Sequence, residues 1–313
     1  MKEERNNNTE KKSIIGTSTS SFGVSKRENH DSSKFYNSNL YKEMIRPQKV
    51  QFVDNSNEIS KDVLNRIILG NSEDMKEIPN NSVHLMITSP PYNVSKEYDD
   101  DLTLTEYLTM LKNVFQETWR VLVPGGRVAI NIANIGRKPY IPLHAYIIEI
   151  MHSIGFHMRG EIIWNKGASA GISCAWGSFA SASNPCIRDV HEYILVFSKL
   201  TNKLEKGEKK TSITNEDFVK CSKSVWQFSA ASAKRVGHPA PFPEELPKRL
   251  IEFYSYIGDV ILDPFVGSGT TAIAAYQLKR NYIGYDIAEE YVKLANKRLL
   301  EYKKTQKSIK DYV

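Results

Sequence analysis

Residues 259–278, DVILDPFVGSGTTAIAAYQL, determine the predicted fold because they join a buried strand, a glycine turn and a helix. The apolar run before Asp263 is typical of a strand, and the alanine-rich run after Gly269 is typical of a helix. The segment that follows, NYIGYDIAEEYVKLANKRL, repeats strand and helix. Such alternation, with almost continuously apolar strands, predicts an α/β fold: a mostly parallel twisted sheet with helices on both faces.

The upstream chain continues this alternation. We predict strands over residues 64–70, 83–87, 127–133, 160–166 and 191–199. Thr103 and Glu106 form a capping-box pattern before a helix that the Pro124-Gly125-Gly126 run would end. A second helix is expected over residues 145–153, and a third within residues 238–257, where apolar side chains recur at helical spacing. Residues 204–217 are polar and are expected to form a surface loop.

Composition sets broader limits on the chain. Of its 313 residues 41% are hydrophobic and 25% charged, which is typical of a globular protein, and the net charge of +6 permits a polyanionic partner. Residues 1–45 carry few large apolar groups, so we expect a disordered polar tail before a folded domain over residues 46–313. Three cysteines without metal-ligand spacing indicate reduced thiols in the cytoplasm. No apolar run is long enough for a membrane span.

The glycine turn is the first candidate binding site. Gly267 and Gly269 allow a tight turn and a close approach of the backbone to a ligand. Asp286 ends the next strand, where an acid can accept hydrogen bonds from ribose hydroxyls. The full G-x-G-x-x-G pattern and the lysine of a phosphate-binding loop are both absent. The pattern favours a nucleoside ligand without a pyrophosphate, and the alternative is a turn that serves only strand-to-helix packing.

The second candidate is the run ITSPPYNV, residues 87–94, which leaves an apolar strand. Two prolines make a stiff loop whose carbonyl oxygens are available as acceptors, and Ser89 adds a hydroxyl beside them. Tyr92 offers a flat face on which a planar ring could stack. Acceptors on the hydrogens of an aromatic amine would favour a pyramidal nitrogen with its lone pair directed at an incoming methyl group. The alternative is a proline-bounded strand exit with a half-buried tyrosine.

Together the two motifs resemble a known family. Ser89-Pro90-Pro91-Tyr92, followed far downstream by the Asp263–Thr270 loop DPFVGSGT, is similar to the S-adenosylmethionine-dependent amino methyltransferases that act on DNA. The catalytic motif precedes the cofactor motif, which is the circularly permuted order of the beta group in that family. The resemblance covers residues 67–300 and implies a Rossmann-like methyltransferase fold, with residues 46–313 as the catalytic domain.

The resemblance also implies roles for individual residues. Ser89, Pro90, Pro91 and Tyr92 would form the catalytic loop. Asp286 would bind the ribose of S-adenosyl-L-methionine, and Asn71, which stands where many members have aspartate, would contact its adenine. The full set of implied cofactor-binding residues is Asn71, Pro241, Phe242, Asp263, Phe265, Gly267, Ser268, Gly269, Thr270 and Asp286.

The acceptor is predicted from Ser89, because members with serine at this place are commonly cytosine-N4 enzymes and members with aspartate commonly methylate adenine N6. Cytosine would be flipped out of double-stranded DNA onto Tyr92. Residues 166–237 are expected to contain the DNA-recognition segments, with Lys166, Trp176, Lys234 and Arg235 as candidate contacts. The implied enzyme recognises a specific site, modifies DNA alongside a restriction endonuclease, and is a monomer or homodimer.

Other readings compete with this one. Pro185-Cys186 is similar to the nucleophile signature of enzymes that methylate carbon 5 of cytosine, but it lies past the catalytic strand and in the wrong order. Adenine N6 is the nearest rival acceptor. A catalytically silent DNA-binding module with the same fold is the most distant alternative.

Overall fold

The computed structural model describes residues 36–42, 48, 57–92, 102–136, 138–167, 177–231 and 243–311, with side chains up to residue 306. The chain separates into two compact units, residues 1–46 and 47–313. Within the first unit the described residues include a short 3-10 helix, η1, Asn39–Tyr41. The predicted disordered tail lies outside the described residues except for residues 36–42.

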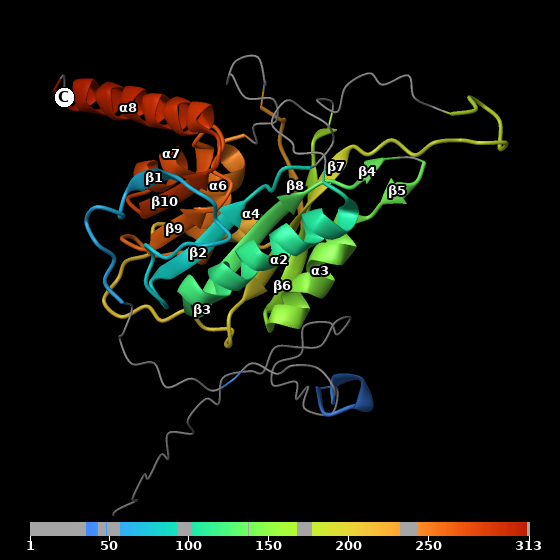
Figure 1. Cartoon of the computed structure of the whole chain (residues 1–313), viewed down its shortest axis with the longest axis horizontal. Coiled ribbons are helices and arrows are strands. Elements are labelled where there is room, and N and C mark those ends of the chain that lie inside the picture. The colour runs from blue at the N-terminus through green and yellow to red at the C-terminus, as the bar shows by residue number, and fades with distance from the viewer. Residues whose placement is uncertain are drawn as a thin grey trace, which may run out of the picture. The chain divides into compact units, whose positions relative to one another are not determined.

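The described part of the second unit contains an eight-stranded sheet (Figure 1). Its order is β1-β10-β9-β2-β3-β7-β6-β8. The strands are β1 Arg66–Leu69, β2 Val83–Thr88, β3 Leu122–Ile132, β6 His157–Asn165, β7 His191–Ser198, β8 Val225–Gln227, β9 Val260–Asp263 and β10 Asn281–Asp286. Neighbours pair in parallel except β7, which is antiparallel to β3 and to β6. The predicted mostly parallel sheet is confirmed, and the last two strands of the chain lie between the first two, as the permuted order requires.

Helices cover both faces of the sheet, as predicted (Figure 1). On one face α2, Leu104–Val121, and α3, Leu143–Ile154, share a hydrophobic cluster with Met86 of β2. On the other face α6 (Glu245–Tyr254), α7 (Thr270–Gln277) and α8 (Glu289–Asp311) share a second cluster with Ile87. Successive side chains of a strand point to opposite faces, so the apolar run of β2 supplies both cores.

The region between α2 and β3 differs from the prediction. The Thr103–Glu106 capping box is present, but α2 ends at Val121 and β3 begins at Leu122. The strand therefore runs through Pro124-Gly125-Gly126, and its register with β2 jumps from Leu122 to Arg127. Gly125 has φ +77°, and a Cβ there would meet the carbonyl of Lys203. The glycines thus form an irregularity inside a strand rather than the end of a helix.

Short elements were also missed. The predicted polar loop ends in α4, Asn215–Cys221, which is followed by β8 at the edge of the sheet. A hairpin of β4, Ile135–Gly136, and β5, Tyr140–Ile141, follows β3. The strand β8 depends on its pairing with β6, where Trp226 lies opposite Trp164, and such a partner is invisible in local sequence. Within the residues described, no helix has the length and apolar character needed to cross a membrane.

Candidate active site

The predicted catalytic loop, residues 89–92, and the predicted cofactor loop, residues 263–271, leave neighbouring strands at the same end of the sheet. Strands β2 and β9 are parallel, with Leu85 opposite Ile261, so their carboxyl ends lie side by side. Thr88, the residue before Ser89, donates a hydrogen bond from Oγ1 to Oδ1 of Asp263 at 2.7 Å. Two motifs that are far apart in the chain are therefore joined by one buried hydrogen bond.

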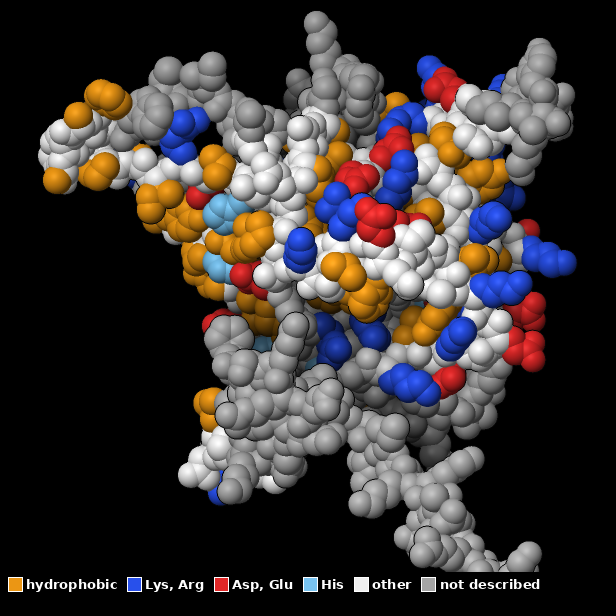
Figure 2. Space-filling model, turned by 180° about the vertical axis from the view of Figure 1, so that it is seen from behind, with side chains coloured by type: hydrophobic (Ala, Val, Ile, Leu, Met, Phe, Trp, Pro, Cys, Tyr) orange, Lys and Arg blue, Asp and Glu red, His pale blue; other side chains and the backbone are white. Residues whose placement is uncertain are grey.

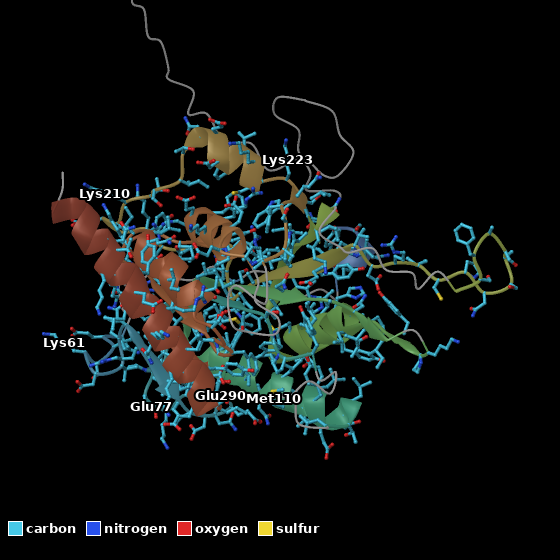
Figure 3. All side chains as sticks on the ribbon, turned by 90° about the horizontal axis from the view of Figure 1, so that it is seen from above. Lys61, Glu77, Met110, Lys210, Lys223 and Glu290 are labelled. Carbon is cyan, nitrogen blue, oxygen red and sulfur yellow. The ribbon has the colours of Figure 1, made fainter. Side chains whose placement is uncertain are left out.

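Both loops line one cavity of about 720 Å³, within the usual size range of small-molecule sites. Eight predicted site residues line it: Asn71, Ser89, Pro90, Pro91, Tyr92, Phe265, Gly267 and Asp286. The prediction missed several other lining residues, among them Glu73, Tyr107, Asn113, Glu290 and Tyr291. Figure 3 shows Glu290, at the start of α8, near Met110 of α2, and both line the cavity. The position of Glu290, four residues after Asp286, was the available signal for this second acid.

Asp286 is oriented by the backbone around it. Its Oδ2 accepts a hydrogen bond from the N–H of Gly267 at 3.0 Å, and its Oδ1 accepts one from the N–H of Ala288 at 2.9 Å. Burial raises the pKa of Asp286, and these backbone donors oppose that rise. Each carboxylate oxygen can accept more than one hydrogen bond, so Asp286 can still accept from a ligand hydroxyl in the cavity.

The two glycines of the cofactor loop have different functions. Gly267 lines the cavity with φ +49°, so the backbone approaches the ligand space there. Gly269 does not line it, and begins α7 with φ +78°. A Cβ on Gly269 would lie 2.8 Å from the Cβ of Ala295 in α8. The packing explanation therefore holds for Gly269, whereas Gly267 lines the cavity and its contact with a ligand stays a prediction.

Three predicted cofactor residues lie beneath the loop rather than along the cavity. Asp263 is 2% exposed, and its carboxylate accepts hydrogen bonds from Thr88, from Thr271 at 2.6 Å and from the N–H of Phe265 at 3.2 Å. Burial raises its pKa to about 6. Ser268 and Thr270 are buried, with their hydroxyl oxygens 3.4 Å apart. These side chains support the loop, and their contact with a cofactor stays a prediction.

The segment after β1 forms another wall of the cavity. Asn71 accepts a hydrogen bond from the N–H of Glu73 at 2.9 Å, and the carboxylate of Glu73 accepts from Asn71 at 3.1 Å and from Asn113 of α2 at 2.7 Å. The carboxylate of Glu73 is therefore tied to both walls. A role for Asn71 in adenine binding stays a prediction.

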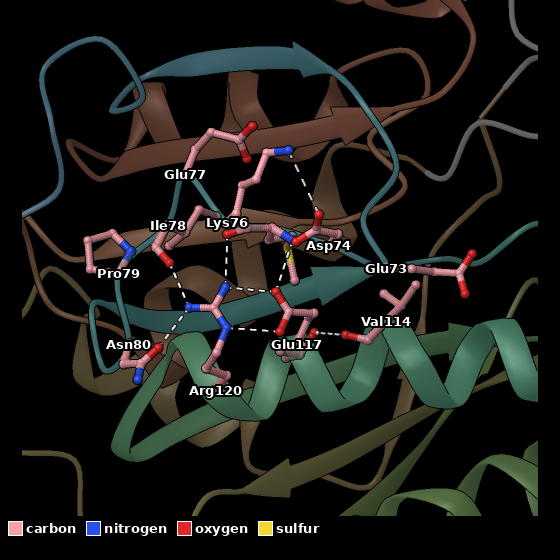
Figure 4. A network of polar contacts seen from close by, with 12 residues as sticks. Glu73, Asp74, Lys76, Glu77, Ile78, Pro79, Asn80, Val114, Glu117 and Arg120 are labelled. Atoms are coloured by element: carbon pink, nitrogen blue, oxygen red, sulfur yellow. Dashed lines mark hydrogen bonds and ion pairs between the residues drawn. The ribbon is translucent and has the colours of Figure 1, made fainter.

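Arg120 of α2 fastens the rest of this segment (Figure 4). Its guanidinium donates to the carbonyls of Met75 and Ile78 at 2.9 and 2.8 Å, and pairs with Glu117 at 2.7 Å. Glu117 in turn accepts a hydrogen bond from the N–H of Met75 at 2.9 Å. The planar guanidinium can donate in several fixed directions, so one side chain holds two turns of the segment.

The catalytic loop is held by side chains from other elements. The hydroxyl of Tyr107 in α2 donates to the carbonyl of Pro91 at 2.7 Å, so this carbonyl already has a partner. No described residue donates to the carbonyl of Pro90, and Pro90 lines the cavity beside Ser89. The hydroxyl of Tyr92 lies 3.4 Å from Oγ of Ser89 and 3.3 Å from Glu192. Burial and the charge of Glu192 raise the pKa of Tyr92, which keeps its hydroxyl protonated.

The predicted DNA contacts are mostly outside the described residues. Trp176, Lys234 and Arg235 lie outside them, as do the predicted cofactor residues Pro241 and Phe242. Lys166 is described, and its ammonium pairs with Glu192 at 2.9 Å. On the face shown in Figure 2, acidic side chains lie among the basic ones, in keeping with the modest net charge.

Cys186 does not take part in the cavity. It lies in the segment after Gly177, and the described lining of the cavity does not include it. Trp164 is 2% exposed and stacks on Phe228, to whose carbonyl it donates at 2.9 Å. Trp164 is therefore a core residue, and the thiol of Cys186 is not placed to attack a base held on Tyr92.

The lining residues fit the predicted cofactor. S-adenosyl-L-methionine carries a nucleoside and a positively charged sulfonium and amine. Asp286 offers acceptors for ribose hydroxyls, and Glu73 and Glu290 add negative charge to the same cavity. Phe265 and Tyr291 provide apolar and aromatic surface. The chemistry of this donor set matches a cationic nucleoside.

Comparison with known proteins agrees with this assignment. A DNA methylase family model (N6_N4_Mtase) matches residues 83–297. Type II methyltransferase M.MjaI of Methanocaldococcus jannaschii is 34% identical over 284 residues, which cover 75% of this chain and 93% of that protein. Type II methyltransferase M.BglII of Bacillus subtilis is 32% identical over 251 residues, 75% of this chain and 69% of that protein.

Solved structures show the same architecture. TTHA0409 of Thermus thermophilus, described as a DNA modification methylase and solved in complex with S-adenosyl-L-methionine, is 31% identical, with a TM-score of 0.62 over 76% of this chain and 95% of its own. PvuII DNA methyltransferase, which is cytosine-N4-specific, has a TM-score of 0.57 over 75% of this chain and 90% of its own, at 20% identity, and shows the fold alone.

The solved structures define the class first: this is a Rossmann-like methyltransferase fold, which in TTHA0409 has been solved in complex with S-adenosyl-L-methionine. The chain belongs to the DNA methylase family that groups N6 and N4 amino methyltransferases, and it is a DNA methyltransferase.

Proposed function

We propose that this DNA methyltransferase transfers the methyl group of S-adenosyl-L-methionine to the exocyclic N4 of a flipped cytosine at a specific site in double-stranded DNA. The observation that carries the proposal is the shared cavity, which Ser89 and Tyr92 line together with Gly267 and Asp286. The serine that opens the catalytic motif favours cytosine, because serine-bearing members of the family that the motifs resemble are commonly cytosine-N4 enzymes. The permuted motif order supports membership of the beta group.

The catalytic loop suits an amine nucleophile. Ser89 and Pro90 line the cavity, where the serine hydroxyl and the Pro90 carbonyl would accept hydrogens of an exocyclic amine. These acceptors would direct the nitrogen lone pair toward the cavity, and the ring of Tyr92 would hold the base in that orientation by stacking. When bound, the cofactor supplies an electrophilic methyl group.

The cofactor wall has a separate task. Asp286 would hold the ribose through its two fixed oxygens, and Phe265 would cover the cofactor from the side of the glycine loop. Asn71 would contact the adenine, with its amide oriented by Glu73. Pro241 and Phe242 would contact the methionine end, and Asp263, Ser268, Gly269 and Thr270 keep their predicted places around the cofactor.

The substrate and its context follow from the same chemistry. The amine of a base stacked and paired inside a duplex cannot reach into a cavity of this kind, so the target would be flipped out. Lys166, Trp176, Lys234 and Arg235, within residues 166–237, are the proposed DNA contacts. The type II relatives support a modification role beside a cognate restriction endonuclease. The proposed location of the enzyme is the cytoplasm. The proposed enzyme is a monomer or homodimer.

Nucleoside analysis tests the acceptor. Purified enzyme is incubated with methyl-labelled cofactor and unmethylated genomic DNA, and the DNA is digested to nucleosides and separated by mass spectrometry. We expect the label in N4-methylcytosine. Cytosine and adenine present the same amine beside a ring acceptor, so label in N6-methyladenine would replace the cytosine proposal while keeping the amino methyltransferase. Label in neither base would overturn the proposed function.

A further inference from the structure

Glu192 lies behind the catalytic loop and collects three hydrogen bonds from three parts of the fold. It belongs to β7, opposite Trp164 of β6, and its side chain is 13% exposed. Oε1 accepts from Nζ of Lys166 at 2.9 Å, and Oε2 accepts from Nδ2 of Asn131 at 2.7 Å. The hydroxyl of Tyr92 donates to the same Oε2 at 3.3 Å. The described cavity lining does not include Glu192, so it acts from behind the wall.

Each of the three groups around Glu192 donates a hydrogen bond to its carboxylate. Lys166 supplies the counter-charge, and Asn131, which is 2% exposed, turns its amino group toward the carboxylate. Oδ1 of Asn131 has no hydrogen-bond partner among the described residues, so the reverse orientation of the amide would set one oxygen against another. Replacing a buried ion pair with apolar side chains is often neutral or stabilising, which makes stability a weak reason for keeping this one.

The position of Glu192 in the sheet gives a better reason for its ion pair with Lys166. In the sheet β3 lies between β2 and β7, so Glu192 reaches the end of the catalytic strand from two strands away. Asn131 of β3 shares Oε2 with Tyr92 and so fixes the point to which the phenol is tied. The backbone of the loop is held separately, at Pro91, by Tyr107. The hydroxyl of Tyr92 contacts Glu192 at 3.3 Å and Ser89 of its own loop at 3.4 Å, so Glu192 is its hydrogen-bond partner from outside the loop.

We infer that Glu192 is a positioning residue for methyl transfer: through Oε2 it fixes the ring of Tyr92 against which the target base stacks, while Lys166 and Asn131 hold its carboxylate in place. The inference rests on the proposed function, because it takes Tyr92 as the stacking platform. It also gives Lys166 a role inside the fold, beside any contact with DNA.

A double-mutant cycle tests the tether. Glu192→Met removes the acceptor at similar length, and Tyr92→Phe keeps the ring but removes the hydroxyl. We expect Glu192→Met to lower the single-turnover rate of methyl transfer about tenfold, the scale of a lost hydrogen bond to a charged group, with unchanged cofactor affinity. Glu192→Gln, which can still offer an oxygen to Tyr92, should restore most of the rate.

The discriminating comparison is the double variant. In the Tyr92→Phe background the Glu192→Met change should have no further effect on the rate, because the bond it removes is already gone. Glu161→Met on β6, a half-buried acid in the same strand pair, is the matched control and should leave the rate unchanged. Equal losses from Glu192→Met in both backgrounds would overturn the inference, since they would indicate general damage to the fold.

A spectroscopic measurement keeps the inference testable apart from the reaction. 3-Fluorotyrosine placed at position 92 should give one sharp ¹⁹F resonance, which broadens or splits in Glu192→Met and keeps its form in Glu161→Met. An unchanged resonance in Glu192→Met would show that the ring is oriented without Glu192. If the wild-type enzyme methylates neither base in DNA, the proposed function fails, whereas this resonance still reports whether the tether exists.

Discussion

The cofactor loop, residues 263–271, and the catalytic loop, residues 89–92, leave adjacent strands at one edge of the sheet but are held in different ways. The cofactor loop is held partly from within, by Asp263 bound to Thr271 and to the backbone of Phe265, and partly by Asp286 of β10, which accepts a hydrogen bond from Gly267. The catalytic loop is held from outside, by Tyr107 of α2 and Glu192 of β7. A single hydrogen bond, from Thr88 to Asp263, joins the two.

This difference separates binding from chemistry. Changes in the cofactor loop and its acid Asp286 should lower cofactor affinity, because these residues shape the nucleoside wall of the cavity. Changes around the catalytic loop should lower the rate of methyl transfer and leave cofactor affinity unchanged. A cofactor-loop variant that lowers only the rate, or a catalytic-loop variant that lowers only cofactor affinity, would contradict this division.

The largest effect is expected from Asp286→Ala. Loss of two hydrogen bonds from ligand hydroxyls to a carboxylate should lower the affinity for S-adenosyl-L-methionine about 10³-fold, measured by isothermal titration calorimetry. Glu289→Ala, three residues on at an exposed position that pairs with Lys293, should bind like the wild type. Equal affinities for the two variants would remove Asp286 from the cofactor site.

The next effect is a pH dependence of stability from Asp263. Its pKa in the folded protein is about 6, above the ordinary value of 3.8, so the folded state binds this proton more tightly than the unfolded state. Stability from this group is therefore greatest at low pH and is lost as pH rises from about 4 to about 6. Relative to wild type, Asp263→Asn should gain up to about 3 kcal/mol across this window.

Urea unfolding at several pH values between 4 and 7 measures that gain. Asp62→Asn, at an exposed position, serves as the control and should follow the wild-type curve. A constant difference between Asp263→Asn and wild type across the window would show that the buried carboxylate does not carry the charge penalty assigned to it.

A smaller effect is expected from Tyr92→Ala in the catalytic loop. Stacking of a base on an aromatic ring contributes roughly 1–3 kcal/mol, so the single-turnover rate should fall by about 10²-fold. Calorimetric cofactor affinity should match that of the wild type. A drop in cofactor affinity with an unchanged rate would assign Tyr92 to cofactor binding rather than to methyl transfer.

The smallest effect is expected from Tyr107→Phe. This change removes the hydrogen bond to the Pro91 carbonyl and little volume, and such bonds contribute about 1 kcal/mol. The rate of methyl transfer should fall by about fivefold. Steady-state analysis should show the loss in kcat with KM for the cofactor unchanged. An unchanged rate in Tyr107→Phe would show that the loop backbone keeps its place without this hydrogen bond.

The contrast between the loops also explains what the sequence could predict. The capping box of Thr103 and Glu106, the glycine turn and the acid at Asp286 are local patterns, so the sheet, its helices and much of the cavity follow from them. The family resemblance carried by the two motifs also predicted which two loops meet. Each of these features depends on residues that lie within about twenty positions of one another in the sequence, or on strands that pair in the usual parallel order.

The remainder depends on contacts that spacing does not encode. Glu192 lies 100 residues from Tyr92, and Tyr107 reaches Pro91 from a helix whose pattern indicates only packing. The helix boundary at Val121 was misplaced because Gly125 serves an irregular strand rather than a helix end. The burial of the Asp263 and Ser268 side chains beneath the loop was also not predictable from their motif.

The most direct test of the proposed active site is a crystal structure of the enzyme with S-adenosyl-L-homocysteine and a DNA duplex that contains the target site. We predict the cofactor product between Phe265 and Asp286, with its ribose hydroxyls donating to the Asp286 carboxylate. We also predict a cytosine outside the helix, stacked on Tyr92, with N4 facing Ser89 and the Pro90 carbonyl. A flipped base that contacts neither Ser89 nor Tyr92, or a cofactor bound outside this cavity, would contradict the account.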